Sequence, residues 1–209
     1  MKAFLVNYNF TPTWLLDSDL DYVIHDRSDS KDYLKDFDQS KIVYEANVGQ
    51  VDFPKLNYLY ENYDQLPDVF LWGKANLFKY ITEEEYGKVK DNQLFTPLLT
   101  QNHKTYSDNL GPVCYYSGGM YNERLDVANA AIRQFSTRYF NRYQDFAKHF
   151  HISSPYYLPF APGGNHILTK EVVHRYSKDF YGEMASILPY CREPAEAQMC
   201  ERSYYQMWQ

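Results

Sequence analysis

Short apolar segments alternate with helical or turn-forming segments through the first half of this chain of 209 residues. The apolar segments, at 2–8, 22–26, 41–46 and 68–72, have the length and composition of buried strands. From Asp52 onward, ahead of the last segment, apolar residues recur at the spacing of an amphipathic helix. Alternating strands and helices are typical of a parallel sheet covered by helices. The pattern therefore predicts an α/β fold.

The second half of the chain has a different pattern. One long helix is predicted over 125–149, a turn-rich aromatic segment covers 153–165, and helical spacing resumes over 166–188. A final helix begins near Pro194 and continues to where the sequence stops, which is compatible with a domain cut from a longer polypeptide. No repeat or linker divides the chain, so we expect a single domain over residues 1–209.

Charge and cysteine content limit the classes of partner and compartment. The formal net charge is −6, and no block of lysine or arginine provides the basic face that nucleic acid requires. No apolar run reaches the roughly 18 residues of a membrane-spanning helix, and no signal peptide is recognisable. The three cysteines lack the spacing of a disulfide framework or a zinc site. We therefore expect a cytoplasmic protein that neither binds nucleic acid nor inserts into a membrane.

Common nucleotide-binding and catalytic motifs are absent from the sequence. It contains no GxxxxGK[ST], no GxGxxG after the first strand, no GxSxG and no HExxH. A P-loop nucleotidase and a dinucleotide-dependent enzyme are therefore not supported. The candidate site residues are instead polar residues that follow the predicted strands, because ligands of open α/β sheets bind at the carboxyl ends of strands.

Two polar loops follow the first and second predicted strands. Asn7, Tyr8 and Asn9 suit a nucleobase, through hydrogen bonds to its edge and stacking on the tyrosine ring, although a plain Asx turn explains them equally well. Asp26 can bind a ribose hydroxyl or a base N–H, and Arg27 can neutralise a phosphate. The alternative for this second loop is the capping of a following helix.

Two further loops contain glycines beside polar residues. After the fourth strand, Trp72 is followed by Gly73, which permits close approach of a ligand, and by Lys74, which can place a positive charge beside a diphosphate. The segment 161–166, APGGNH, offers a second glycine-rich edge. In both cases a simple turn is the alternative. The candidates in the second segment are Gly163, Gly164 and Asn165.

Carboxylates border the apolar stripe of the final helix. Glu196 and Glu201 lie on the two borders, and Glu193 precedes the helix. Such a group can act as a general base or stabilise an oxocarbenium-like centre, although ordinary solvent-facing glutamates give the same pattern. Glu196 or Glu193 is the candidate for a base, and Glu201 is as plausible a carboxylate beside the reacting centre.

Three segments of the chain resemble one protein family. They read NVGQVDFPKLNYLYENYDQLPDVFLWGK, GGNHILTKEVVHRYSKDFY and AEAQMCERSYYQMW. In this order they resemble blocks of a GT-A-type nucleotide-sugar glycosyltransferase family from fungi, bacteria and large DNA viruses, and the chain is most similar to the viral domains, which are thought to build capsid glycans. The resemblance covers roughly 41–208.

This resemblance implies a fold, a reaction and a cofactor. The fold would be a single-domain α/β sandwich around a mixed, mostly parallel sheet, with the nucleotide bound by about 1–100 and the acceptor and catalytic groups in about 101–209. The reaction would move a sugar from a UDP-sugar to a hydroxyl of a glycan or glycoprotein, in the host cytoplasm if the protein is viral. A divalent metal, Mn²⁺ or Mg²⁺, usually bridges the diphosphate in such enzymes.

The chain departs from the family where a metal-binding Asp-x-Asp motif is expected. After the fourth strand it has WGKAN, and the acidic residues at 17–21 lie at the wrong end of the second strand. Either Lys74 replaces part of the metal's charge, or a metal binds through Asn76, Asp26 or His166. We favour the second alternative slightly. A non-catalytic glycan- or nucleotide-sugar-binding module with the same fold is the main rival function, and a nucleotidyltransferase is a weaker one.

Overall fold

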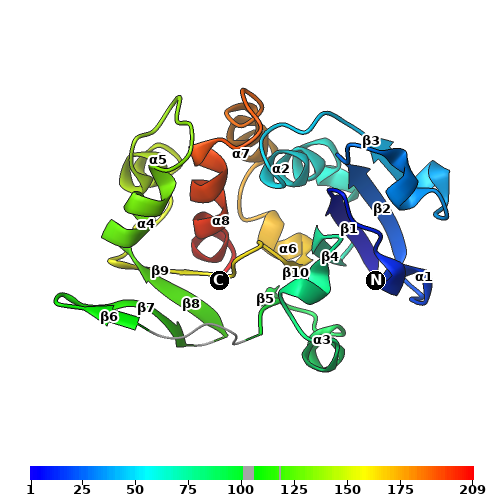
Figure 1. Cartoon of the computed structure of the whole chain (residues 1–209), viewed down its shortest axis with the longest axis horizontal. Coiled ribbons are helices and arrows are strands. Elements are labelled where there is room, and N and C mark those ends of the chain that lie inside the picture. Colours follow the sequence, from blue (N-terminus) through cyan, green and yellow to red (C-terminus); the bar gives the residue numbers. More distant parts are fainter. Residues whose placement is uncertain (101–105, 118) are drawn as a thin grey trace.

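A mixed sheet of six strands organises the amino-terminal part of the computed structural model, which describes residues 1–100, 106–117 and 119–209 (Figure 1). In spatial order the strands are β3 (Ile42–Tyr44), β2 (Asp21–Asp26), β1 (Lys2–Asn7), β4 (Val69–Lys74), β10 (His166–Thr169) and β5 (Thr96–Pro97). Strands β1 to β4 are parallel, whereas β10 runs antiparallel to β4 and β5. The α/β class and the mixed sheet are therefore confirmed, and the four strands predicted in the first half are present.

A second, antiparallel sheet lies at the other end of the molecule (Figure 1). Its order is β6 (Tyr106–Asp108), β7 (Gly111–Ser117), β8 (Met120–Arg124) and β9 (Tyr157–Phe160). The sequence analysis did not predict this sheet. The predicted division of the chain near residue 100 falls at 101–105, which lie outside the described residues.

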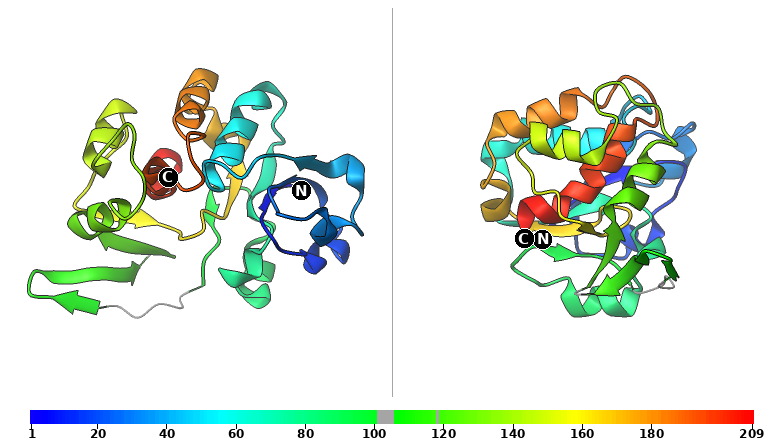
Figure 2. Two further views of the ribbon diagram at one scale, coloured as in Figure 1. Left: turned by 45° about the horizontal axis from the view of Figure 1, so that its top comes forward. Right: turned by 90° about the vertical axis from the view of Figure 1, so that its left-hand side faces the viewer.

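Helices fill the space between and beside the two sheets. They are α1 (Thr13–Leu16), α2 (Asp52–Glu61), α3 (Glu83–Val89), α4 (Leu125–Ile132), α5 (Tyr143–His149), α6 (Lys170–Val173), α7 (Lys178–Ser186) and α8 (Ala195–Trp208). Short 3₁₀ turns occur at Lys31–Leu34, Gln39–Lys41, Tyr63–Gln65 and Leu77–Lys79. The left view of Figure 2 shows α2 in cyan, α7 in orange and α5 in yellow-green along one side of the molecule.

Successive side chains of β1 point to opposite faces of the sheet and pack into two different apolar cores. Phe4 and Val6 join a core with α2, α7 and α8, and the Phe4 ring stacks on Tyr58 with 4.1 Å between ring centroids. Ala3 and Leu5 join a smaller core on the opposite face. Both faces of the sheet are thus covered, and the ends of its strands remain as the place for polar groups.

Helix α8 contacts both halves of the molecule, since it packs against β9, α4 and α5 as well as α2. Its predicted apolar stripe is confirmed: Ala197, Cys200, Tyr204, Met207 and Trp208 are all buried. The rings of Tyr204 and Trp208 are parallel and 5.1 Å apart, and the indole of Trp72 from β4 meets both of them edge-on. This aromatic cluster joins α8 to the central sheet.

The long helix predicted over 125–149 is wrong, because α4 ends at Ile132 and α5 begins only at Tyr143. In the intervening loop, the backbone N–H groups of Arg138, Tyr139 and Phe140 bind the Glu196 carboxylate instead of helical carbonyls. A distant side chain therefore provides the acceptors that a continuous helix would have provided. The helical interpretation of 166–188 also needs correction, since His166–Thr169 is strand β10 and pairs with β4 and β5.

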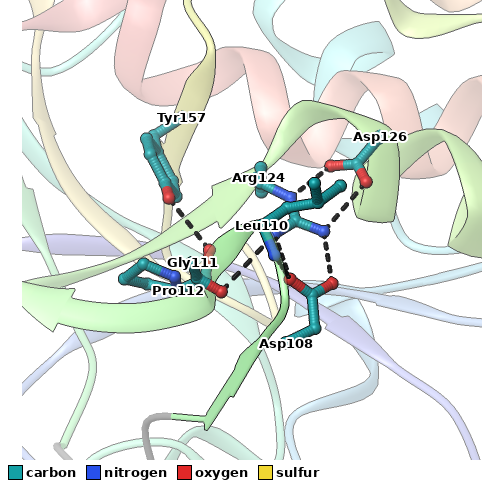
Figure 3. A network of polar contacts seen from close by, with 7 residues as sticks. All are labelled: Asp108, Leu110, Gly111, Pro112, Arg124, Asp126 and Tyr157. Atoms are coloured by element: carbon teal, nitrogen blue, oxygen red, sulfur yellow. Dashed lines mark hydrogen bonds and ion pairs between the residues drawn. The ribbon is translucent and has the colours of Figure 1, made fainter.

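Arg124 connects the β6–β7 hairpin to the start of α4 through hydrogen bonds (Figure 3). Its guanidinium is buried and forms two hydrogen bonds with Asp108, at 2.8 and 2.6 Å, and two with Asp126, at 2.6 and 3.0 Å. The Tyr157 hydroxyl donates to the Pro112 carbonyl in the same region, at 2.9 Å. Both carboxylates are partly exposed while the arginine is buried, so the network lies at the surface. We call these contacts of Arg124 with Asp108 and Asp126 the Arg124 clamp.

Candidate functional site

A pocket of about 190 Å³ lies at the carboxyl ends of β1 and β4. The chain runs from β1 to β2 and β3 on one side of β1 and returns to β4 on the other, so the strand order reverses between β1 and β4. In open α/β sheets this switch point is where ligands bind. The pocket is lined by Val6, Asn7, Tyr8, Phe10, Val51, Lys74, Asn76 and Tyr80.

Larger hollows elsewhere are less suited to a ligand of this fold. One of about 710 Å³ is lined partly by Met1, Asp17 and Asp19, which adjoin the amino ends of β1 and β2. The predicted acidic loop at 17–21 therefore lies at the amino ends of the strands, opposite the switch point at their carboxyl ends. For this reason we place the candidate site at the smaller pocket.

A polar network joins the tips of β1 and β2. Asn7 Nδ2 donates to Asp26 Oδ1 at 3.0 Å, and the same oxygen accepts from the Ser28 hydroxyl at 2.6 Å. The other two oxygens, Asn7 Oδ1 and Asp26 Oδ2, are buried and have no hydrogen-bond partner among the described residues. A buried acceptor without a donor is costly, and of these two residues Asn7 lines the pocket.

Tyr8 forms the rim of the pocket and connects it to a residue that sequence reasoning missed. The Tyr8 hydroxyl donates to Asp29 Oδ2 at 3.1 Å and accepts from Arg192 Nη2 at 2.8 Å. The Arg192 guanidinium also lies 5.0 Å from the centroid of the Tyr8 ring. Arg192 comes from the loop before α8, so only the tertiary fold brings it to β1.

Asn9 does not line the pocket and has a turn-forming role. Its backbone has φ 49°, and its side chain exchanges two hydrogen bonds with Asp29, at 2.7 and 2.9 Å. The bond that Asn9 Nδ2 donates, with that from Tyr8, holds the pKa of the Asp29 carboxyl below its usual value. Asn9 therefore links the loop after β1 to the loop after β2, whereas Asn7 and Tyr8 contribute to the pocket.

Lys74 provides a cation to the pocket. Its Nζ donates to the Tyr80 hydroxyl at 3.2 Å and lies 5.0 Å from the centroid of that ring. Burial opposes its charged form, but the charges of Glu201, Tyr80 and Asp52 outweigh that effect, so the pKa of Lys74 is raised. The ammonium is therefore charged at neutral pH.

The turn at 163–165 is held from three sides and supports the wall of the pocket. The Gly163 N–H donates to Glu201 Oε1 at 2.7 Å, Lys55 Nζ donates to the Gly164 carbonyl, and Asn165 Oδ1 accepts from the Lys74 N–H at 2.7 Å. Gly163 has φ 91°, and a Cβ there would lie 2.6 Å from the Tyr80 ring. The predicted glycine-rich edge thus packs against two residues that line the pocket.

Lys55 and Asp52 form a buried ionisable pair behind this turn that sequence reasoning also missed. Burial lowers the pKa of Lys55 to about 7 despite Asp52, and burial raises the pKa of Asp52 to about 6 although Lys55 opposes the shift. Tyr204 donates a hydrogen bond of 2.5 Å to Asp52, and the Lys55 ammonium lies 4.0 Å from the centroid of the Trp72 ring. The helical periodicity identified α2, but it gave no reason to single out its polar residues.

The predicted catalytic glutamates are in three different environments. Glu196 is fully buried, and its carboxylate accepts hydrogen bonds from three backbone N–H groups of the 138–140 segment and from the Tyr190 hydroxyl. Glu193 is exposed before α8. Glu201 is partly exposed and contacts the turn behind Tyr80. Burial argues against contact between Glu196 and a sugar. Glu201 is the predicted glutamate that is connected to the pocket, because it binds Gly163, which packs on the lining residue Tyr80.

The remaining predicted binding residues do not face the pocket. Trp72 is fully buried in the aromatic cluster, and Arg27 is buried with its guanidinium on the carbonyls of Ala46 and Val48. Burial lowers the pKa of Arg27 to about 10. Gly73 lies against the Asn165 side chain. These residues shape the strand tips and the loop after β3 without lining the pocket.

The residues predicted to hold a metal do not form a metal site. His166 is enclosed by aromatic rings, and burial holds its pKa well below the usual value. Asp26 is bound by Asn7 and Ser28, and Asn76 offers only a neutral amide. Among the described residues no three His, Cys, Asp or Glu side chains gather as ligands. This donor set does not fit Mn²⁺ or Mg²⁺, which take several oxygen ligands that include carboxylates.

The fold and the pocket define an α/β protein with a small pocket of mixed polar and apolar lining, Lys74 included, at the switch point of a mixed sheet. Comparison with known protein families, curated proteins and solved structures gives no match to the chain. Within the described part of the chain, every helix is too short or too polar to cross a lipid bilayer.

Proposed function

We propose that this protein is a glycosyltransferase that moves a sugar from a UDP-sugar to a hydroxyl of a glycan or glycoprotein acceptor. The observation that carries the proposal is the convergence of Asn7, Tyr8 and Lys74 on one pocket at the switch point between β1 and β4. The unpartnered acceptors of Asn7 and Asp26 suit the N–H and O–H groups of a nucleoside, and Lys74 suits its diphosphate.

In this reaction the bond between the anomeric carbon and the β-phosphate oxygen breaks, and its electron pair stays on the phosphate. The acceptor oxygen bonds to the anomeric carbon, and its proton passes to a base. The Lys74 ammonium would stabilise the charge that develops on the departing diphosphate, which is electrostatic catalysis. Glu201 is the carboxylate we assign to the sugar side of the site, because it binds the turn that packs on Tyr80.

Isothermal titration of the intact chain with UDP tests this proposal. We expect binding at micromolar to millimolar UDP and weaker binding of ADP, because a nucleobase held by the tips of β1 and β2 must match their donors and acceptors. Absence of binding by UDP and UDP-sugars at millimolar concentration would contradict the function.

A non-catalytic nucleotide-sugar-binding module is the second candidate. One observation favours it: the carboxylate of Glu196 is enclosed by its own chain, which reduces the set of available bases. Such a module would bind UDP-sugars without releasing UDP, so a coupled assay for UDP release separates the two candidates.

A further inference from the structure

Two cations from distant parts of the chain are associated with residues of the pocket. Lys74 comes from the end of β4 and lines the pocket directly. Arg192 comes from the loop before α8 and reaches the pocket through Tyr8, on which its guanidinium lies. Tyr8 itself lines the pocket, so Lys74 contributes to the pocket directly and Arg192 contacts one of its lining residues.

Neither cation forms an ion pair with a carboxylate, although Asp29 lies near Arg192 and accepts a hydrogen bond from the same Tyr8 hydroxyl. The hydrogen-bond partners of Lys74 Nζ and of the Arg192 guanidinium are the hydroxyls of Tyr80 and Tyr8. Within the described ranges, neither residue takes part in an ion pair. Glu201 and Asp52 act on Lys74 only from beyond ion-pair distance. Both side chains therefore keep donors and charge for an anionic ligand, which charge-assisted hydrogen bonds would hold.

The same arrangement is unfavourable for a divalent cation. Lys74 lies at the end of β4 and lines the pocket, and an ammonium there repels a metal ion. The neighbouring pocket residues contribute amides, hydroxyls and apolar groups but no pair of carboxylates. A diphosphate and two cations, by contrast, are complementary in charge.

We propose that the Lys74 ammonium and the Arg192 guanidinium together bind the diphosphate of the nucleotide, and that this binding needs no divalent cation. The inference rests on the proposed function for the identity of the nucleotide. It adds Arg192 as a binding residue and assigns to protein cations the role that a metal usually has in enzymes of this kind.

Titration calorimetry with UDP in EDTA and in MnCl₂ tests the inference. For the wild type we expect dissociation constants that agree within about twofold in the two buffers. Lys74→Met and Arg192→Met should each weaken UDP binding by about tenfold or more, as expected when a charged hydrogen bond is lost. Both should leave the affinity for uridine, which lacks phosphates, within about twofold of the wild type.

Matched variants control for folding and for general charge. Lys88→Met and Arg133→Met remove exposed cations outside the pocket and should bind UDP like the wild type. Lys74→Arg keeps the charge and should recover most of the affinity lost in Lys74→Met. Equal losses of UDP and uridine affinity in the Met variants would show structural damage and overturn the assignment.

The outcomes separate this inference from the proposed function. UDP binding that occurs only with Mn²⁺ would overturn the inference and leave the glycosyltransferase proposal standing. UDP binding in EDTA that Lys74→Met and Arg192→Met do not weaken would also overturn it. No binding of UDP in either buffer would overturn both proposals.

Discussion

The side chain of Asn165, which precedes β10, continues the pairing of β4 beyond His166, the first residue of β10. Its Oδ1 accepts a hydrogen bond of 2.7 Å from the backbone N–H of Lys74, two residues after the His166–Trp72 pair that ends the ladder. The backbone from which the Lys74 ammonium extends is thereby fixed. Gly73 permits this contact, because a Cβ there would lie 2.8 Å from Asn165 Oδ1.

Gly73→Ala should therefore destabilise the protein through Asn165. We expect a loss of about 2 kcal/mol in the free energy of unfolding and a clearly smaller loss in an Asn165→Ala background, because the clash and the hydrogen bond involve the same atom. Urea unfolding of the four proteins of this cycle measures the coupling. Gly87→Ala, in open space on α3, should be neutral or slightly stabilising. Equal costs of Gly73→Ala in both backgrounds would refute the coupling.

Glu196→Ala should reduce stability more than ligand binding. The buried carboxylate accepts three backbone hydrogen bonds, and its removal leaves those N–H groups without this acceptor, at a cost of up to about 3 kcal/mol. Urea unfolding should show this loss, while calorimetry should give an unchanged UDP affinity. The exposed Glu61→Ala serves as the control. A stable variant with lost transfer activity would instead restore Glu196 as a catalytic residue.

Lys55 should make the stability of the protein depend on pH in the alkaline range. Its pKa is about 7 in the folded protein and near 10.5 when exposed, so unfolding takes up a proton between these values. The free energy of unfolding should then rise with pH from 8 to 10, by up to about 1.4 kcal/mol per pH unit. Lys55→Met should lack this rise, whereas Lys88→Met should keep it. Parallel pH profiles for wild type and Lys55→Met would contradict the assignment.

The strand tips could be predicted from the sequence because the signals are local. A short apolar run that ends in polar residues is visible along the chain, and parallel strands bring such ends together. Asn7, Tyr8 and Lys74 were found in this way. The burial of Glu196 was not visible, because a border position on a helix does not reveal which loop folds over it.

Arg192, the second sheet and the broken helix depend on contacts between distant segments. Arg192 and Tyr8 are 184 residues apart. Strands β8 and β9 pair Tyr121 with Phe160 across two helices and a loop. The burial of β8 does not alternate, and that of β9 alternates over only four residues. Local periodicity contains no information about such partners.

Asp108 offers a spectroscopic test of the Arg124 clamp. The hydrogen bonds from Arg124 lower the pKa of Asp108 to about 2, so the clamp stabilises the folded state above pH 4 and is lost as the pH falls toward 2. Carboxyl carbon chemical shifts in an NMR titration should report this low pKa. In Arg124→Met it should return to near 4, while Arg133→Met should leave it low. A pKa near 4 in the wild type would show that the clamp does not form in solution.

Glu201→Gln should separate catalysis from binding at the proposed site. The amide oxygen of glutamine can still accept the hydrogen bond from the Gly163 N–H, so the turn behind Tyr80 keeps its support while the negative charge is removed. If Glu201 is the base, UDP release from a UDP-sugar should fall by about 100-fold or more with little change in UDP affinity. Glu61→Gln should leave both quantities unchanged. Unimpaired turnover in Glu201→Gln would exclude Glu201 as the base, and a wild type without turnover would favour the binding module.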